Sequence, residues 1–139
     1  MREEKFRELK KLEAVVEKLD RDLDSIIVEG HADRKVMKQL GFNGKIFLSA
    51  EKTVEDLVED VARGSKRTAI LTDFDSHGKK ENKKIRQALE GKINNSISSR
   101  EELGKQLTKN GRMTVEDATP LLEDKEQKFI DAKLSRLYT

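Results

Sequence analysis

The sequence lacks cysteine and tryptophan and contains a single proline. Without cysteine, neither a disulfide framework nor a cysteine-type zinc site can form, and the chain has no need of an oxidising compartment. No apolar run approaches the ~20 residues that a membrane-spanning helix requires, and the charged N-terminus has no apolar segment of the kind found in secretory signals. We therefore expect a cytoplasmic protein with no membrane partner.

Aromatic residues are also scarce, with five phenylalanines and one tyrosine, so the sequence offers no evident stacking platform for single-stranded nucleic acid. Charged residues make up 40% of the chain, but the net charge is only +2. That balance does not by itself indicate a nucleic-acid partner. The basic residues are unevenly placed, however, and a cluster of them is either a solvated helix face or a surface that contacts phosphates. This cluster consists of Lys79, Lys80, Lys83, Lys84 and Arg86.

The spacing of apolar residues predicts one α/β domain. A chain of 139 residues suits a single core, and segments with helical spacing alternate with short β-branched runs. This alternation predicts three layers around a mainly parallel, four-stranded sheet. We expect helices over residues 2–20, 33–40, 54–62, 79–89 and 99–107, and strands over residues 26–28, 45–49, 68–72 and 112–116.

Capping signals and composition refine this outline. Gly41 is placed to end one helix, Thr53 to cap the next, and Ser99 to open a later one. Residues 92–111 are expected to form an exposed polar excursion. We expect residues 1–23 to form an amphipathic helix packed on a domain of residues 24–120, and residues 121–139 to form a C-terminal helix.

Two apolar runs end in acidic residues followed by glycine. The first reads Ile26-Ile27-Val28-Glu29-Gly30-His31-Ala32-Asp33, and the second reads Ala69-Ile70-Leu71-Thr72-Asp73-Phe74-Asp75-Ser76-His77-Gly78. Buried parallel strands deliver such residues to one edge of the sheet. Asp73 and Asp75, two residues apart, point the same way if the chain is extended there, which suits Mg²⁺ with Mn²⁺ as a possible substitute. The alternative is a polar strand end that caps the following helix.

The combination resembles the Toprim domain, over roughly residues 24–120. The matching residues are Val28-Glu29-Gly30-x-x-Asp33 and the strand that ends Asp73-x-Asp75-x-x-Gly78. The likeness is greatest to small stand-alone Toprim proteins of archaea and bacteria, and residues 113–118 are also similar to a stretch of the ribosomal-RNA maturation nuclease. The resemblance implies a three-layer, Rossmann-like fold, with Glu29 as general acid or base and with Asp73 and Asp75 as Mg²⁺ ligands. Gly30, Asp33 and Gly78 then support the site.

Both histidines of the chain lie beside these motifs. Where primases and maturation nucleases commonly carry lysine, this chain has His31, which contacts phosphate best when protonated. His77 is either a third metal ligand, favouring Mn²⁺ or Zn²⁺, or a loop histidine. The segment from Asp73 to His77 is also similar to the haloacid-dehalogenase phosphatase motif, although that motif has Thr or Val at the position of His77 and lies on the first strand.

Two functional hypotheses follow. In the first, the chain is a Mg²⁺-dependent nuclease that cleaves RNA or DNA, with Lys79, Lys80 and Lys83 holding neighbouring phosphates. In the second, it is a non-catalytic module that binds structured RNA, such as ribosomal RNA, or a partner protein. The single tyrosine, Tyr138, is remote in sequence from the acidic motifs, so covalent strand passage of the topoisomerase type has no local nucleophile.

Overall fold

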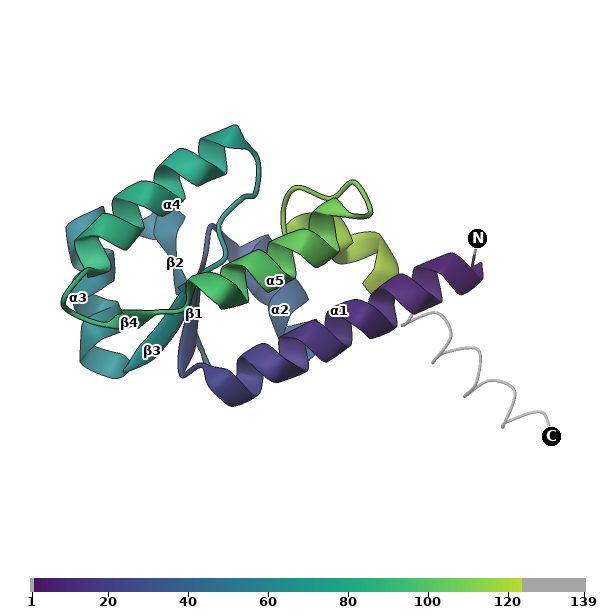
Figure 1. Cartoon of the computed structure of the whole chain (residues 1–139), viewed down its shortest axis with the longest axis horizontal. Helices are drawn as coiled ribbons and strands as arrows, with labels where there is room; N and C mark the ends of the chain where they lie inside the picture. Colours follow the sequence, from purple (N-terminus) through teal and green to yellow (C-terminus); the bar gives the residue numbers. More distant parts are fainter. Residues whose placement is uncertain (1, 124–139) are drawn as a thin grey trace.

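A computed structural model describes residues 2–123 of the chain, except for the side chains of residues 2 and 76–79 (Figure 1). Its centre is a four-stranded sheet in the order β2-β1-β3-β4, and every pair of neighbouring strands is parallel. This confirms the predicted α/β fold with a four-stranded parallel sheet. The strands are β1 (Ser25–Val28), β2 (Lys45–Leu48), β3 (Arg67–Ile70) and β4 (Asn94–Asn95).

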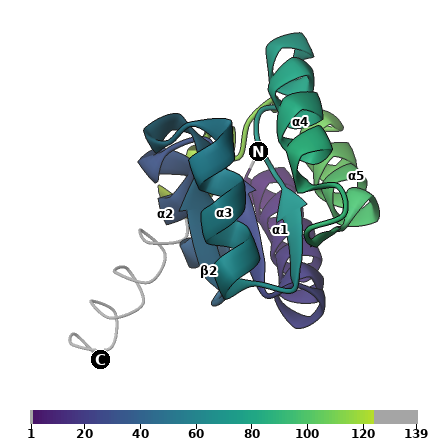
Figure 2. The same cartoon turned by 90° about the vertical axis from the view of Figure 1, so that its left-hand side faces the viewer.

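Helices cover both faces of the sheet (Figures 1 and 2). One apolar cluster joins the sheet to α1 (Arg2–Asp22), α2 (His31–Leu40) and α5 (Ile97–Thr108). A second cluster joins the opposite face to α3 (Val54–Gly64) and α4 (Ser76–Leu89). Successive residues of β1 therefore serve different layers: Ile26 and Val28 belong to the first cluster and Ile27 to the second. Because both faces are covered, β1 is buried along its whole length.

Several helix ends lie where the sequence predicts them. Gly41 ends α2 with a φ of 113°, in the left-handed region that glycine enters without a Cβ penalty. The Thr53 hydroxyl caps α3 by accepting from the N–H of Asp56. Three helices begin earlier than expected. Helix α2 begins at His31 rather than Asp33, and α4 begins at Ser76 rather than Lys79. Helix α5 begins at Ile97 because Ser96, not Ser99, is its cap. The Ser96 hydroxyl accepts from the N–H of Ser99 at 3.3 Å.

The predicted fourth strand over residues 112–116 is wrong. Asp117 holds this segment in a turn, since its carboxylate accepts from the N–H groups of Met113 and Thr114 at 3.0 and 3.1 Å. A short 3₁₀ helix, η2 (Glu116–Ala118), follows. With its N–H groups satisfied by a side chain, the backbone has less to gain from joining a sheet.

The polar excursion expected over residues 92–111 is also wrong. The fourth strand is the two-residue β4, which pairs with Arg67 and Thr68 at the edge of the sheet. The following helix, α5, buries Leu103 and Leu107 against the first apolar cluster. Few local signals mark a two-residue strand of asparagines, so the segment appears as a polar loop until its long-range pairing is known.

Residues 119–123 are helical, and Leu121 and Leu122 are buried. The remainder of the helix expected over residues 121–139 lies outside the described residues. Within residues 2–123, no helix is both long enough and apolar enough to cross a membrane.

Candidate functional site

Glu29 and Asp73 each follow a buried strand. Glu29 comes directly after β1, and Asp73 comes shortly after β3, the neighbouring strand in the sheet. The pairing continues beyond the end of β3, where the N–H of Leu71 donates to the carbonyl of Ile27 at 2.7 Å. The carboxyl groups of Glu29 and Asp73 then meet in a side-chain hydrogen bond. The sheet therefore brings together two acids that are more than forty positions apart in the sequence.

This contact changes the chemistry of Asp73. Its pKa is raised from 3.8 to about 7, chiefly by burial, then by the hydrogen bond with Glu29 and by repulsion from the charges of Glu29, Asp33 and Asp75. Two carboxyl groups at hydrogen-bond distance resist ionising together because their like charges repel. Below about pH 7 the pair therefore holds a proton, and the negative charge that it keeps favours a nearby cation.

Asp75 lies directly before α4 and is exposed. Its charge contributes to the raised pKa of Asp73, which places it within electrostatic range of the pair. In the part of the chain that the structure describes, no three His, Cys, Asp or Glu side chains are grouped so as to hold a metal ion. The structure thus joins Glu29 to Asp73 but does not group Asp75 with them as a ready three-ligand site.

Arg100, on α5, fixes the chain that carries Asp73. Its guanidinium donates to the carbonyls of Ile70, Thr72 and Asp73 at 3.0, 2.8 and 3.1 Å. It also lies over the ring of Phe74, 4.4 Å from the ring centre. Burial lowers the pKa of Arg100, and the charge of Asp73 opposes that shift. Sequence reasoning assigned no role to Arg100, because its expected helix over residues 99–107 was placed within an exposed polar excursion rather than against β3.

Phe74 packs against α5, where its ring contacts Arg100 and Gly104. A Cβ at Gly104 would lie 2.8 Å from the Phe74 ring, so the ring needs a glycine at this position of the helix. The N–H of Phe74 donates to the carbonyl of Met113 at 2.7 Å. Asp73 is therefore followed by a residue that is fixed on both its side chain and its backbone.

Asp33 performs the corresponding role for the first motif. It is buried, and its two carboxylate oxygens accept from the N–H of Gly30 at 3.2 Å and the N–H of Glu116 at 2.9 Å. The first bond fixes the start of α2 directly after Glu29, and the second ties this turn to η2. Residues 113–116 thus contact both motifs, through Asp33 and through Phe74, although they do not form the expected strand.

The other residues predicted at the site are dispersed. His31, on α2, is exposed and its Nε2 lies 2.6 Å from the carboxylate of Glu51, so its described partner is an acid. Lys80 and Lys83 are exposed on α4. On the same helix, Glu81 accepts a hydrogen bond at 2.9 Å from the hydroxyl of Ser49, which directly follows β2. His77, Gly78 and Lys79 lie in the first turn of α4. The positions of the His77 and Lys79 side chains are not among those that the structure describes. Sequence reasoning did not select Ser49 or Glu81.

The fold and its acidic edge define an α/β protein whose candidate site lies where adjacent parallel strands end. The chain is 30% identical over 119 residues to the UPF0292 protein of Pyrococcus furiosus, an alignment that covers 86% of this chain and 89% of that protein. The chain therefore belongs to the UPF0292 family. A solved structure of a protein from Aquifex aeolicus matches the fold with a TM-score of 0.61 and 22% identity, over 80% of this chain and 94% of the other. No family model matches the chain.

The shifted pKa of Asp73 predicts a pH dependence of stability. Folding raises this pKa from 3.8 to about 7, so the folded protein binds the proton of Asp73 more tightly than the unfolded chain does. The resulting stabilisation of the folded state is complete below pH 3.8 and is lost as the pH rises through about 7. In EDTA, we expect the free energy of unfolding to fall over this range. Asp73→Asn, which mimics the neutral carboxyl, should flatten the profile. Urea unfolding followed by circular dichroism at several pH values measures the effect.

The matched control for this experiment is Asp22→Asn. Asp22 is exposed at the end of α1, so this variant should follow the wild-type pH profile. The same pH profile in wild type and in Asp73→Asn would contradict the raised pKa.

The contacts of Arg100 predict a cost for its most conservative replacement. Lysine keeps the charge in Arg100→Lys but cannot reproduce the planar guanidinium fork, so carbonyls at the end of β3 lose their donors. We expect the free energy of unfolding to fall by about 1–3 kcal/mol. We also expect the pKa of Asp73, followed by carbon NMR, to move toward its ordinary value as the contact with Glu29 loosens. Arg63→Lys, an exposed change on α3, is the control; Arg100→Lys behaving like this control would show that the fork does not position Asp73.

Proposed function

We propose that this protein is a Mg²⁺-dependent enzyme of phosphoryl transfer on nucleic acid, a nuclease of the Toprim type. The observation that carries the proposal is the contact between Glu29 and Asp73 at the carboxyl edge of adjacent parallel strands. Open α/β sheets place their chemistry at this edge. The two motifs that meet there are those whose residues resemble the Toprim domain.

The residues present suit a hard divalent cation. Glu29, Asp73 and Asp75 offer only carboxylate oxygens, which Mg²⁺ prefers, with Mn²⁺ as a substitute. Mg²⁺ commonly takes one or two protein carboxylates and completes its shell with water and substrate phosphate. That habit fits a site in which two acids meet and the third lies nearby without forming a three-ligand group among the described residues. We therefore assign Asp73 and Asp75 as the ligands that hold the ion together with substrate.

The roles of the side chains follow from this arrangement. When bound, the metal supplies charge that polarises the scissile phosphate and offsets the negative charge of the transition state. Glu29 accepts a proton from the attacking water or returns one to the leaving oxygen, which its contact with Asp73 positions it to do. Arg100 and Asp33 are positioning residues, because they form hydrogen bonds with backbone groups around the acids.

The exposed lysines of α4 provide a surface for the nucleic-acid backbone. Lys80, Lys83 and Lys84 are spaced so that they share one side of the helix. The same helix begins next to Asp75, so bound phosphates would extend from the acidic edge along α4. A run of like charges with i, i+3 and i+4 spacing is mildly destabilising to a helix, and a polyanion would offset that cost.

A second candidate function is a module that binds structured RNA or a protein without cleaving anything. The contact between His31 and Glu51 favours it, because the imidazole that stands in place of lysine engages an acid of its own chain. In this alternative the acidic edge still makes metal-bridged contacts with phosphate, and no bond is broken.

Cleavage assays separate the two functions. The wild type, Asp73→Asn and Glu29→Gln would be incubated with labelled structured RNA and duplex DNA in Mg²⁺ or Mn²⁺. We expect the wild type to cleave one class of substrate and Asp73→Asn to lose both cleavage and metal binding measured by calorimetry. Glu29→Gln should reduce turnover by about 10²-fold while binding of nucleic acid changes little, because only the transition state requires the proton carrier.

Asp22→Asn and Glu17→Gln are controls that change the same groups on exposed positions of α1. Nucleic-acid binding by the wild type without cleavage of any substrate, in either metal, would favour the non-catalytic module. Cleavage that persists in Asp73→Asn would show that the acidic pair is not the active site.

The lysines of α4 carry a separate prediction. Lys80→Ala and Lys83→Ala should each weaken nucleic-acid binding and lower the slope of its salt dependence by about one, as expected for one lost phosphate contact. Fluorescence anisotropy at several salt concentrations measures this. Lys66→Ala is the matched control, since Lys66 is exposed just before β3, at the opposite end of that strand from the acids. An equal loss in the control would indicate a general charge effect rather than a binding face on α4.

A further inference from the structure

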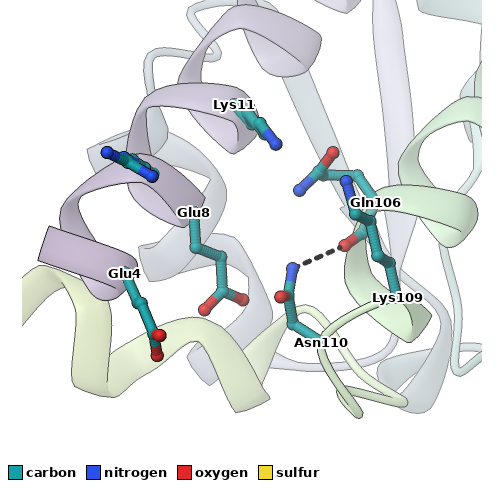
Figure 3. A pocket seen from close by; sticks show the side chains of 7 residues that line it. Glu4, Glu8, Lys11, Gln106, Lys109 and Asn110 are labelled. Atoms are coloured by element: carbon teal, nitrogen blue, oxygen red, sulfur yellow. Dashed lines mark hydrogen bonds between the residues drawn. The ribbon is translucent and has the colours of Figure 1, made fainter. Parts of the chain in front are cut away.

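A pocket of about 210 Å³ lies between the N-terminal part of α1 and the C-terminal end of α5 (Figure 3). It is formed by residues of the first three turns of α1 and by residues at and just beyond the end of α5, away from the acids of the candidate site. The lining residues are Glu4, Arg7, Glu8, Lys11, Gln106, Lys109 and Asn110. Three of these side chains are cationic and two are amides.

The cations lie closer together than their charges favour. The side chains of Lys11 and Lys109 approach each other, and Arg7 adds to the repulsion, although all three side chains are exposed. The proximity of Lys109, together with its charge and that of Arg7, lowers the pKa of Lys11. Positive groups held together in this way gain from an anion placed among them.

The acids of the pocket leave this positive charge largely unbalanced. Glu8 is buried and already paired, because Arg112 donates to its two carboxylate oxygens at 2.6 and 3.1 Å. Glu4 is exposed, and Figure 3 shows its carboxylate pointing away from Lys11. The part of the pocket around Lys11 and Lys109 therefore has an excess of donors.

Gln106 adds a further donor to this part of the pocket. Its amide nitrogen is buried and has no hydrogen-bond partner within the described chain. Figure 3 shows the Gln106 side chain on the same side of the pocket as Lys11 and Lys109, and the Asn110 amide donates to the backbone carbonyl of Gln106 at 3.4 Å. A buried donor without an acceptor is unfavourable, so this amide favours a ligand that brings hydrogen-bond acceptors.

We propose that this pocket binds a phosphate group through Lys11, Lys109, Arg7 and the amide of Gln106. The volume suits one oxyanion, since it is several times the ~30 Å³ share of a water molecule but below the ~300 Å³ at which pockets for drug-sized ligands begin. A phosphate supplies several acceptor oxygens and up to two negative charges, which matches a set composed only of donors. The proposal does not depend on the nuclease activity proposed above.

Calorimetry with inorganic phosphate tests the proposal, with chloride as the competing salt. We expect saturable binding that Lys11→Gln and Lys109→Gln each weaken at least tenfold. Gln106→Glu, which has the same shape but places a negative oxygen in the pocket, should abolish binding while the protein stays folded by circular dichroism. In the amide NMR spectrum, the side-chain signal of Gln106 should shift as phosphate is added.

The control is Lys35→Gln, an exposed lysine on α2 outside the pocket, which should bind phosphate as the wild type does. A second arm compares an oligonucleotide carrying a 5′-phosphate with the same oligonucleotide ending in a hydroxyl, in Asp73→Asn protein so that cleavage does not interfere. A preference for the phosphorylated end identifies a nucleic-acid terminus as the source of the group, and binding of inorganic phosphate alone identifies the free ion. Absence of saturable binding in both arms, or equal weakening by Lys35→Gln, would overturn the proposal.

Discussion

Two carboxyl groups, those of Glu29 and Asp73, meet where adjacent parallel strands end, and much of the surrounding structure prevents them from moving apart. Left to themselves, two acids in contact would separate or turn to solvent, since their repulsion falls with distance. Here burial and a hydrogen bond raise the pKa of Asp73 to about 7 instead. The contact is maintained because the backbone beneath each acid is fixed by groups from distant parts of the chain.

Those groups come mainly from the C-terminal third of the described residues. Arg100 on α5 binds three carbonyls around the end of β3, and the Phe74 ring packs against Gly104 of the same helix. On the other strand, Asp33 links the turn after Glu29 to η2. The acids themselves are on short local motifs, but their relative position depends on residues between 27 and 83 positions further along the chain. The relative position of the two acids is thus fixed by the surrounding scaffold rather than by the motifs alone.

The difference between local motifs and distant positioning residues explains how much of the molecule could be predicted from its sequence. Strands β1, β2 and β3 have strong local signals, because each is a short apolar run. In β1 and β3 the run is followed by acid and then glycine, which also identifies the acids of the site. The two asparagines of β4 have none, since their strand is determined by pairing with the remote β3. The turn at Asp117 does have a local signal, because Thr114 and Asp117 exchange the reciprocal hydrogen bonds of a capping box, but the apolar residues around it were interpreted as a strand. Arg100 went unrecognised for the same reason as β4: its role exists only after α5 is placed against β3.

Helix α5 contributes residues to both the acidic site and the cationic pocket. Near its N-terminus Arg100 reaches the chain around Asp73, and at its C-terminus Gln106 and Lys109 line the pocket shared with α1. The middle of the helix is anchored in the core by Leu103 and Leu107, so the two ends are parts of one rigid element. From Arg100 to Lys109 the axial rise is about 13 Å at 1.5 Å per residue. Over such a distance, charges exposed to water at physiological salt are largely screened from each other. The acidic edge and the cationic pocket can thus keep opposite electrostatic characters on the same small domain.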